Sequence, residues 1–466
     1  MKCKIFLFIL LFLLSGGLTK TAVAARISRS ADLKKVENVD ADDTKNNVDE
    51  QSPTDTVSAS DNTDDLMERN VILYPLADSV INSPRKVRVL LNKNIFSKNI
   101  FVYGKIKVSS QSVNINISQG SLRFSTIDEN SVQISAHGRS AQVALPCTLS
   151  FVSVTNVFSY DAKEYRGNII FTGGKNGISV INVINVEDYL RGVVPLEIGV
   201  RGEQEFEALK AQAIAARTYT LSKIIYGKDK EFDLLPTTAD QVYGGVNCEY
   251  ALSDKAIKET QGIVIVKDDA ALLETYYHST CAGKTSAIDE VWNSAPNASL
   301  ISRTDLRPNG APYCGNSNSY SWKETWTINQ FSQILKKYSK LSNEKPFDGT
   351  VKSVFVVSRS ESGRIYDLAV VSEKGTFHYG KDKIRFILRR PTKEEEILRS
   401  ANFNIKMENN HIYAAGYGYG HGIGMCQTGA IERARAGQNY EEILRAYYND
   451  IKFSTWDEVV ISTCAF

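Results

Sequence analysis

The sequence predicts an α+β fold, in which a β-rich N-terminal half is joined to a half that mixes helices and strands. Residues 71–186 alternate or cluster β-branched residues between Gly and Asn turns, which is typical of strands. Residues 204–224 carry apolar side chains at helical spacing, and later segments show no regular strand–helix–strand repeat. That mixture favours α+β over a parallel α/β sheet.

The N-terminus is typical of a secretory signal peptide, which we expect to span residues 1–25. Lys2 and Lys4 precede the apolar run IFLFILLFLL, and the stretch AVAA supplies a cleavage site. An uncleaved anchor is the alternative, although the run is short for a membrane span of ~20 residues. Residues 26–68 are polar and acidic, so we expect a disordered linker there.

The remaining residues, 69–466, form the predicted folded domain, with a β-rich part at about 71–186 and a mixed part at about 187–466. The alternative is a single body without a boundary. The clearest helix is expected at residues 204–224, where many alanines permit close approach of other elements. After it the pattern predicts a helix at 253–260, a strand at 262–267, a strand at 272–280 that enters a loop, a helix at 327–338, a hairpin of 351–360 and 365–373, and a last helix at 440–448.

The stretch GYGYGHGIGMCQTGA, residues 416–430, places glycine at every second position up to Gly424. Glycine gives a strand nothing to pack and costs backbone entropy, so its repeated use indicates a face of bare backbone. We expect a ligand to lie flat against that face, beside Tyr417, Tyr419 and His421 on the other. The alternative is a close contact with another strand or helix. A helix is expected to begin at about Thr428.

Composition narrows the classes of partner. The formal net charge is +2, and no basic patch of the kind that nucleic acid needs is present, so no nucleic-acid partner is expected. Hydrophobic residues make up 42% of the chain, which is enough for a packed core. Six cysteines follow Cys3, and an even count in an exported chain permits disulfides.

Glu197 is the strongest candidate for a catalytic carboxyl. It lies in VVPLEIG, and its apolar neighbours would raise the pKa of the carboxyl, as a general acid requires. The alternative is a capping or solvated Glu at the start of a helix, and we keep that reading for Glu187 and Asp188. In TADQVYGG, Gln241 and Tyr243 are either turn residues or polar groups that bind sugar.

The segment YYHSTCAGKTS places His278 at a strand end before small residues, where a loop can wrap a ligand. His278 and Cys281, together with His421 or Cys426, form a candidate zinc set. A lone His-x-x-Cys is a poor metal signature, however, and no HExxH helix or GxSxG turn occurs in the chain. No cofactor is therefore assigned, and zinc stays an alternative with His278 as its candidate ligand.

Taken together, these segments resemble the sporulation stage II protein D family, also called SpoIID/LytB or amidase enhancer proteins. The resemblance extends from about Lys86 to near the C-terminus. The matching pieces follow the family's order: VEDYLRGVVPLEIG, EALKAQAIAARTYTL, TADQVYGG, ETYYHSTCAGKTSAIDEVW, SLISRTD with PYC and YSW, LRSANFNI, and GYGYGHGIGMCQTGAIERARAGQNYEEILRAYY.

The resemblance implies a lytic transglycosylase that cleaves peptidoglycan glycan strands, with Glu197 as its single catalytic carboxyl. It implies that residues 187–466 form the catalytic part and that the fold makes a groove for glycan, with a preference for strands free of stem peptides. The family's His/Cys metal site can be placed here only on His278, because Lys284 and Ser286 stand where a further ligand is expected. We expect an exported, periplasmic or cell-wall-associated protein that contacts the membrane only through an uncleaved signal peptide.

The alternative function is a non-catalytic peptidoglycan-binding protein that stimulates a separate cell-wall amidase, which would then be a partner. The residues expected to bind substrate are Gln241, Tyr243, His278, Ser279, Thr280, Tyr417, Tyr419, His421 and Gln427.

A disulfide between Cys281 and Cys314 is expected to join two loops at the rims of the groove, closing a loop of about 33 residues. Two free thiols or a metal pair are the alternatives. The pairing of the other cysteines is left open: Cys147, Cys248, Cys426 and Cys464.

Overall fold

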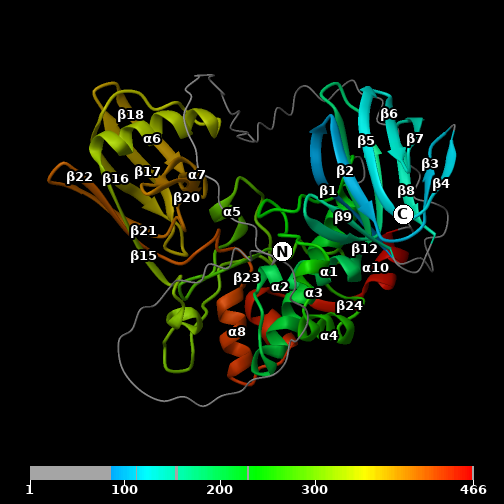
Figure 1. The fold of residues 1–466 in the computed structure, drawn as a ribbon. Coiled ribbons are helices and arrows are strands. Elements are labelled where there is room, and N and C mark those ends of the chain that lie inside the picture. Colours follow the sequence, from blue (N-terminus) through cyan, green and yellow to red (C-terminus); the bar gives the residue numbers. More distant parts are fainter. Residues whose placement is uncertain (1–84, 112, 153–155, 228–229, 464–466) are drawn as a thin grey trace, which may run out of the picture. The chain divides into compact units, whose positions relative to one another are not determined.

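A computed structural model describes residues 85–111, 113–152, 156–227 and 230–463 (Figure 1). The chain divides into two units, Met1–Asp61 and Asn62–Phe466, and every described residue belongs to the second. The predicted signal peptide, the predicted linker and Cys464 lie outside the described residues. Helices and strands both contribute largely to the described part, which confirms the α+β class.

Two six-stranded sheets form the β-rich part and confirm the strands expected there. Phe124 of one sheet and Phe171 of the other lie with ring centroids 4.6 Å apart, so the two sheets share one core. The first sheet has the order β1 (Lys86–Ile95), β12 (Ile178–Asn185), β11 (Asn168–Thr172), β8 (Cys147–Phe151), β3 (Ile106–Ser109) and β4 (Asn114–Ile117). The second has the order β10 (Lys163–Arg166), β9 (Val157–Tyr160), β2 (Ser97–Val102), β5 (Gly120–Asp128), β6 (Ser131–Ala136) and β7 (Arg139–Ala144).

The alanine-rich helix forms as expected and becomes the centre of the next part. α3 (Phe206–Tyr226) buries fourteen of its residues, so other elements contact it on nearly all sides. Arg217 on this helix is fully buried and forms an ion pair of 2.8 Å with Glu187, which lies on α1 (Val186–Arg191). It contacts η1 (Glu203–Glu205), α2 (Val194–Glu197), α4 (Ala251–Glu259) and β13 (Ile263–Val266). β13 pairs antiparallel with β24 (Lys452–Thr455), and η2 (Val246–Cys248) precedes α4 in the chain.

A second hydrophobic core, separate from the first, lies between residues 321 and 417 and was not expected from the sequence. Trp326, Phe331 and Leu368 are fully buried within it. The predicted hairpin is confirmed as β16 (Val351–Arg359) and β17 (Ile365–Ser372), and the predicted helix as α6 (Ile328–Leu341). The remaining elements are β18 (Gly375–Gly380), α7 (Lys383–Ile387), β19 (Arg389–Arg390), β20 (Lys393–Ile397), and the sheet of β15 (Ser321–Thr327), β22 (His411–Tyr417) and β21 (Phe403–Glu408) (Figure 1).

The C-terminal segment returns to the first core. β23 (Met425–Cys426) pairs in parallel with β14 (Tyr277–His278), which brings the end of the glycine repeat beside the HSTC loop. The expected strand at 272–280 is thus reduced to the two residues of β14, with isolated bridges at Leu272 and Thr280. The other elements are α5 (Ile288–Val291), η3 (Tyr313–Asn316), α8 (Gln427–Arg435), α9 (Tyr440–Tyr447) and α10 (Trp456–Thr463). α10 follows α9, so the helix predicted to be the last one is not.

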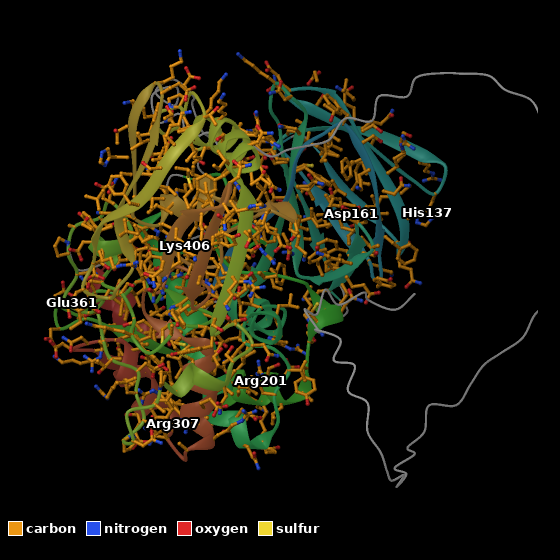
Figure 2. The ribbon with its side chains drawn as sticks, turned by 90° about the vertical axis from the view of Figure 1, so that its left-hand side faces the viewer. His137, Asp161, Arg201, Arg307, Glu361 and Lys406 are labelled. Atoms are coloured by element: carbon orange, nitrogen blue, oxygen red, sulfur yellow. The ribbon has the colours of Figure 1, made fainter. Side chains whose placement is uncertain are left out.

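Exposed charges of both signs come from different elements. Asp161, Glu361 and Lys406 are examples, lying after β9, after β16 and on β21 (Figure 2). This distribution agrees with the small net charge. Within the described ranges, no helix has both the length and the apolar character to cross a membrane.

Candidate active site

The glycine face of residues 416–424 packs against the chain itself. A Cβ added to Gly424 would lie 2.1 Å from the carbonyl oxygen of Tyr276, and one added to Gly418 would lie 2.6 Å from that of Thr280. Both glycines have positive φ, which bulkier residues adopt at a cost. The expectation of a bare backbone face open to a ligand is therefore corrected. The alternative reading, a close approach of two chain segments, is the one that the structure contains.

Two aromatic rings of this segment point away from that contact. Tyr417 and Tyr419 are 47% and 41% exposed, although their neighbouring glycines are largely buried. Thr280 and Tyr419 exchange backbone hydrogen bonds of 3.0 and 2.9 Å, which fixes the backbone position from which the Tyr419 side chain extends. Both rings are therefore accessible to a ligand, and their stacking on sugar stays a prediction.

Glu197 ends the short helix α2 and is held by a single backbone donor. The amide of Val242 donates to Oε1 at 2.7 Å, and the side chain is only partly buried. Pro195 lies at the start of α2, where its fixed φ favours a helical turn. The helix therefore sets the carboxyl where one oxygen is anchored and the residue keeps a path to solvent.

The surroundings of Glu197 make it a weak acid. Burial raises its pKa to about 7, against smaller lowering effects from the Val242 amide and from a hydrogen bond with the Gln427 side chain. Gln427 in turn donates to Gln212 Oε1 at 3.3 Å. A carboxyl with this pKa exchanges its proton near neutrality, which is the property required of a general acid that must later act as a base. The physical expectation from the apolar sequence around Glu197 agrees with this geometry.

Gln241 and Tyr243 lie inside the protein and not on a binding surface. Gln241 is fully buried; its Oε1 accepts from Tyr189 and Thr220, and its Nε2 donates to the Ala216 carbonyl and the Tyr277 hydroxyl. Because these contacts occupy the amide, the expected direct binding of sugar by Gln241 is wrong. The side chain instead anchors the backbone next to Val242.

Tyr243 needs the same correction. Its ring is buried against Tyr165 and Tyr189, with centroids 5.6 and 4.8 Å away, and its hydroxyl lies 3.1 Å from Asn182 Oδ1. A side chain enclosed in this way supports the turn after Gln241 and does not reach a ligand.

His421 is a neutral, fully bonded imidazole. Its Nδ1 accepts from the amide of Ile423 at 3.1 Å, so Nε2 carries the hydrogen that is donated to the Tyr277 carbonyl, also at 3.1 Å. Burial lowers the pKa of His421 to about 4. With both nitrogens engaged, His421 holds two segments together, which corrects its expected role in binding substrate.

His278 is buried and bonds the Ile423 carbonyl through Nδ1 at 3.1 Å, while its Nε2 has no hydrogen-bond partner. Burial, together with the nearby His421 and the cationic Arg364, lowers its pKa well below the usual range. A guanidinium beside the ring disfavours a cation there. His278 also belongs to no group of three potential ligands among the described residues. The zinc site that the family resemblance implies at His278 therefore does not fit this chain.

The two hydroxyl residues after His278 differ in access. Thr280 is fully buried, and its Oγ1 lies 3.2 Å from Oγ1 of Thr428, so it joins the loop to α8 and does not reach a ligand. Ser279 keeps partial exposure and remains available to a substrate. Its carbonyl accepts from the amide of Thr428 at 3.0 Å.

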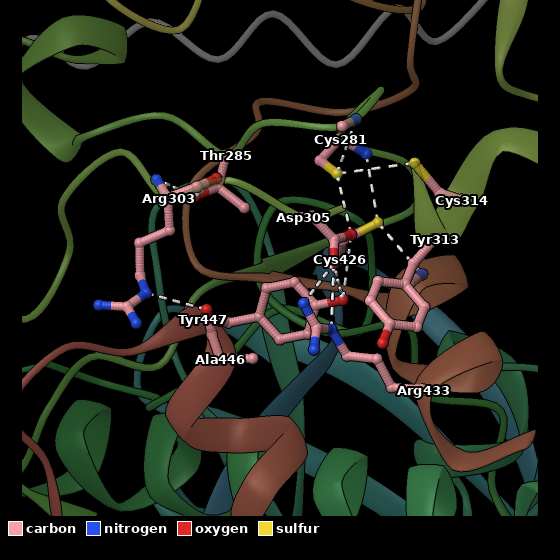
Figure 3. Close-up of polar contacts among 12 residues, drawn as sticks. Cys281, Thr285, Arg303, Asp305, Tyr313, Cys314, Cys426, Arg433, Ala446 and Tyr447 are labelled. Carbon is pink, nitrogen blue, oxygen red and sulfur yellow. Dashed lines mark hydrogen bonds and ion pairs between the residues drawn. The ribbon is translucent and has the colours of Figure 1, made fainter. Parts of the chain in front are cut away.

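Cys281 and Cys314 are neighbours, as expected, but they are not bonded. Their sulfurs lie 3.6 Å apart, well beyond the ~2.05 Å of a disulfide bond. Both are free thiols in the structure, as are Cys147, Cys248 and Cys426. The predicted disulfide is thus corrected. The two thiols do not form an isolated pair, because Cys281 also contacts Asp305 and Cys426 within a larger cluster (Figure 3).

Three residues near the site were not singled out from the sequence. Gln212 is a fully buried amide in the middle of α3, and its Nε2 has no partner of its own. Tyr277 accepts from Gln241, and its raised pKa reflects burial first and then the charge of Glu197. Asp305 lies in a loop rich in polar residues. Of the three, only Gln212 could have been identified from the sequence, because it is a polar residue on an alanine-rich face of the helix.

Comparison with known proteins places two matches on this chain. A family model described as Stage II sporulation protein, SpoIID, matches residues 174–266, which include Glu197 and α3. A model for a domain of unknown function, DUF8618, matches residues 289–424, which include the second core.

Three relatives illustrate the similarity. An uncharacterized protein of Brachyspira hyodysenteriae is 31% identical over 310 residues, which are 65% of this chain and 75% of that protein. A protein named amidase enhancer from Bacillus subtilis is 30% identical over 331 residues, or 64% of this chain and 45% of that protein. Stage II sporulation protein D of Bacillus amyloliquefaciens is 27% identical, covering 59% of this chain and 75% of that protein.

Proposed function

This chain belongs to the SpoIID/LytB family, and from that premise we propose that it cleaves the glycan strands of bacterial peptidoglycan by lytic transglycosylation, with Glu197 as general acid and base. The observation that carries the proposal is the state of Glu197, whose pKa of about 7 leaves it partly protonated near neutrality. An ordinary Glu would be ionised there and could not donate a proton.

The reaction begins with proton transfer. The protonated carboxyl of Glu197 donates to the oxygen of the glycosidic bond, and that bond breaks with positive charge developing at the sugar's C1. The Val242 amide donates to Oε1 at 2.7 Å, so in the protonated carboxyl the other oxygen carries the hydrogen that is donated. Burial of the group supports donation because it disfavours the anion.

The second half of the reaction returns the proton. The ionised carboxyl accepts the hydrogen of the same sugar's C6 hydroxyl, and the C6 oxygen bonds to C1. A 1,6-anhydro end forms, no water is consumed, and Glu197 is protonated again. One carboxyl is sufficient because the substrate supplies its own nucleophile, in contrast to the pair that hydrolytic glycosidases use.

Two other carboxylates of this part of the fold, Glu187 and Asp240, are already committed to partners, which agrees with a single catalytic group. Glu187 is bonded to Arg217 at 2.8 Å. Asp240 accepts from the hydroxyl of Tyr219 at 2.9 Å and from a backbone amide. The Gln427 amide supports the second step, because its hydrogen bond stabilises the anion that Glu197 becomes after proton donation.

We include a preference for glycan without stem peptides as part of the proposal. Bare glycine backbone no longer supports it, because that face is buried against residues 276–281. The support that remains is the family resemblance and the two exposed rings of Tyr417 and Tyr419, which suit sugar faces. Turnover of intact sacculi against sacculi pretreated with an amidase tests it, and equal rates would contradict the preference.

The test of the catalytic assignment compares Glu197→Gln with wild type on purified peptidoglycan. Loss of about 10²–10⁴-fold in rate is expected, because that is the usual worth of acid–base catalysis. Glu203→Gln is the matched control, since it removes an exposed carboxyl six residues further on. Near wild-type activity in Glu197→Gln, or equal loss in both variants, would contradict the assignment.

A second candidate function rests on the relative named amidase enhancer. In that case the protein binds glycan and stimulates a separate cell-wall amidase, without cleaving strands itself. The same preparation decides between the two: stimulation of an added amidase that persists in Glu197→Gln, with no anhydro ends from wild type, favours the binding protein. Export to the periplasm or cell wall belongs to both proposals.

A further inference from the structure

We propose that Cys281, Asp305, Cys314 and Cys426 form a binding site for a structural Zn²⁺ ion, separate from the catalytic carboxyl. The three sulfurs and one carboxylate oxygen lie within 4.8 Å of one another, and all four residues are buried (Figure 3). They come from the loop after β14 (Cys281), the loop between α5 and η3 (Asp305), η3 itself (Cys314) and β23 (Cys426). The proposal does not depend on the proposed function.

The spacing of the cluster matches tetrahedral zinc better than any covalent alternative. Zn–S bonds of about 2.3 Å and Zn–O bonds of about 2.0 Å at tetrahedral angles place ligands about 3.8 Å (S to S) and about 3.5 Å (S to O) apart. The sulfurs of Cys281 and Cys314 are 3.6 Å apart, and Cys281 Sγ is 3.3 Å from Asp305 Oδ2. Three mutually close sulfurs also cannot all pair in one disulfide.

Backbone amides already point at the sulfurs, as they do around metal-bound thiolates. The amides of Cys281 and Gly429 donate to Cys426 Sγ at 3.2 and 3.3 Å, and the amide of Gly283 donates to Cys281 Sγ at 3.3 Å. The donor from Gly283 requires the left-handed turn at Ala282 and Gly283, with φ of 66° and 97°. The loop accepts backbone strain to aim an amide at a sulfur.

The carboxylate ligand is oriented from behind. Arg433 Nε donates to Asp305 Oδ1 at 3.0 Å, and the hydroxyl of Tyr447 lies 3.1 Å from the same oxygen. Oδ2 is thereby turned toward Cys281. The guanidinium of Arg433 lies 4.1 Å from the ring centre of Tyr313, which fixes it in place. Such an outer shell is what a metal-binding carboxylate needs to keep its geometry.

The ligand chemistry selects the ion and its role. Three thiolates and one carboxylate are soft enough to prefer Zn²⁺ over Mg²⁺ or Ca²⁺, which take oxygen ligands. Four protein ligands close the tetrahedron and leave no position for a substrate, so the ion is structural. Two positive charges also offset four buried acidic groups that would otherwise be costly to ionise together.

The consequence for the protein is a clamp beside the active site. Cys426 directly precedes Gln427, whose amide bonds Glu197, and Cys281 follows Ser279 and Thr280. A zinc ion shared by these segments fixes the start of α8 and the HSTC loop relative to each other. Metal binding is therefore expected to raise stability because it holds only the folded arrangement.

Elemental analysis of the purified full chain tests the proposal, with Cys314→Ser as the disrupting variant and Cys248→Ser as the control. We expect about one zinc ion per wild-type and Cys248→Ser chain, and loss of at least tenfold in Cys314→Ser. A strong chelator should lower Tm of wild type and of the control. Co²⁺ in place of zinc should give the visible absorption of a tetrahedral thiolate site, which needs no variant to fold.

Two results would overturn the site. One is wild-type protein that is folded, carries no zinc and gives no cobalt spectrum after refolding with the metal. The other is a Cys281–Cys314 disulfide, detected by peptide mapping without reduction in protein isolated from the exported compartment.

Discussion

Replacing Glu197 by Gln should stabilise the protein, and the gain should depend on pH. Gln has the shape of the protonated carboxyl and keeps an oxygen for the Val242 amide, but it never becomes charged. The native protein instead has to ionise a partly buried acid as the pH rises. The Glu197→Gln substitution therefore removes only the free-energy cost of ionising this carboxyl in the folded state, and it leaves the other titrating groups of the chain in place.

The magnitude follows from the two pKa values of the carboxyl. In the folded state the pKa is raised to about 7, whereas its ordinary value, which applies to the unfolded chain, is 4.5. Between these values the folded protein holds a proton that the unfolded chain has released, so stability falls as the pH rises. At about 1.4 kcal/mol per pH unit the cost approaches about 3 kcal/mol above pH ~7 and vanishes below pH ~4.5.

The assay is urea unfolding of wild type, Glu197→Gln and the control Glu203→Gln at several pH values from about 4.5 to 8. We expect the free-energy difference between Glu197→Gln and wild type to be smallest at the acidic end and to grow in favour of the variant toward pH 8. The control should show no such growth. A difference that stays constant across the range would refute the argument that burial raises the pKa of this carboxyl.

Three further predictions concern the surroundings of the site. Gln427→Leu removes a donor that lowers the pKa of Glu197, so the limb of the pH–rate profile that follows this pKa should move to higher pH; an unmoved or acid-shifted limb contradicts this. Gly424→Ala should destabilise the protein by several kcal/mol in urea unfolding, because the new Cβ meets a carbonyl oxygen, whereas Gly437→Ala, with positive φ but open space, should cost about 1–2 kcal/mol. Equal losses of unfolding free energy in the two variants would contradict the close packing of the glycine face against residues 276–281. Tyr417→Ala and Tyr419→Ala should each weaken glycan binding by about fivefold, on the order of 1 kcal/mol, without lowering Tm; unchanged binding in a pull-down titration would exclude a stacking surface.

Hydrophobic periodicity in the sequence was sufficient to predict the helices and strands whose apolar side chains recur at regular spacing. The helix α3 was expected at 204–224 and lies at Phe206–Tyr226, because its apolar and alanine residues recur at helical spacing. The hairpin of β16 and β17 was equally clear. The second hydrophobic core was missed, because a pattern of strands and helices does not say which apolar faces meet each other.

The glycine repeat shows why a local pattern leaves its partner open. Alternating glycines indicated that something approaches the backbone closely, and this was correct. Whether a ligand or another strand approaches depends on residues 276–281, which lie more than a hundred positions away in the chain. Likewise, polar Gln241 and Tyr243 look suited to bind sugar, yet long-range packing turns both inward.

The raised pKa of Glu197 was predictable because apolar residues adjoin it in the sequence. The cluster of Cys281, Asp305, Cys314 and Cys426 was not, because Asp305 and Cys426 reach it only through the folded loops. The sequence suggested Cys281 and Cys314 as a disulfide, with a metal pair as an alternative, and placed Cys281 with Cys426 only in a candidate zinc set around His278; it did not bring the three cysteines together with Asp305.

We propose that a single carboxyl, that of Glu197, cleaves glycan without consuming water. Mass analysis of the soluble products of purified peptidoglycan digested by wild type and by Glu197→Gln tests it most directly. We expect fragments that end in 1,6-anhydro sugars, lighter by one water than hydrolysed ends, from wild type and at least about a hundredfold fewer from the variant. Reducing ends in place of anhydro ends, or anhydro ends in equal amounts from both proteins, would contradict it.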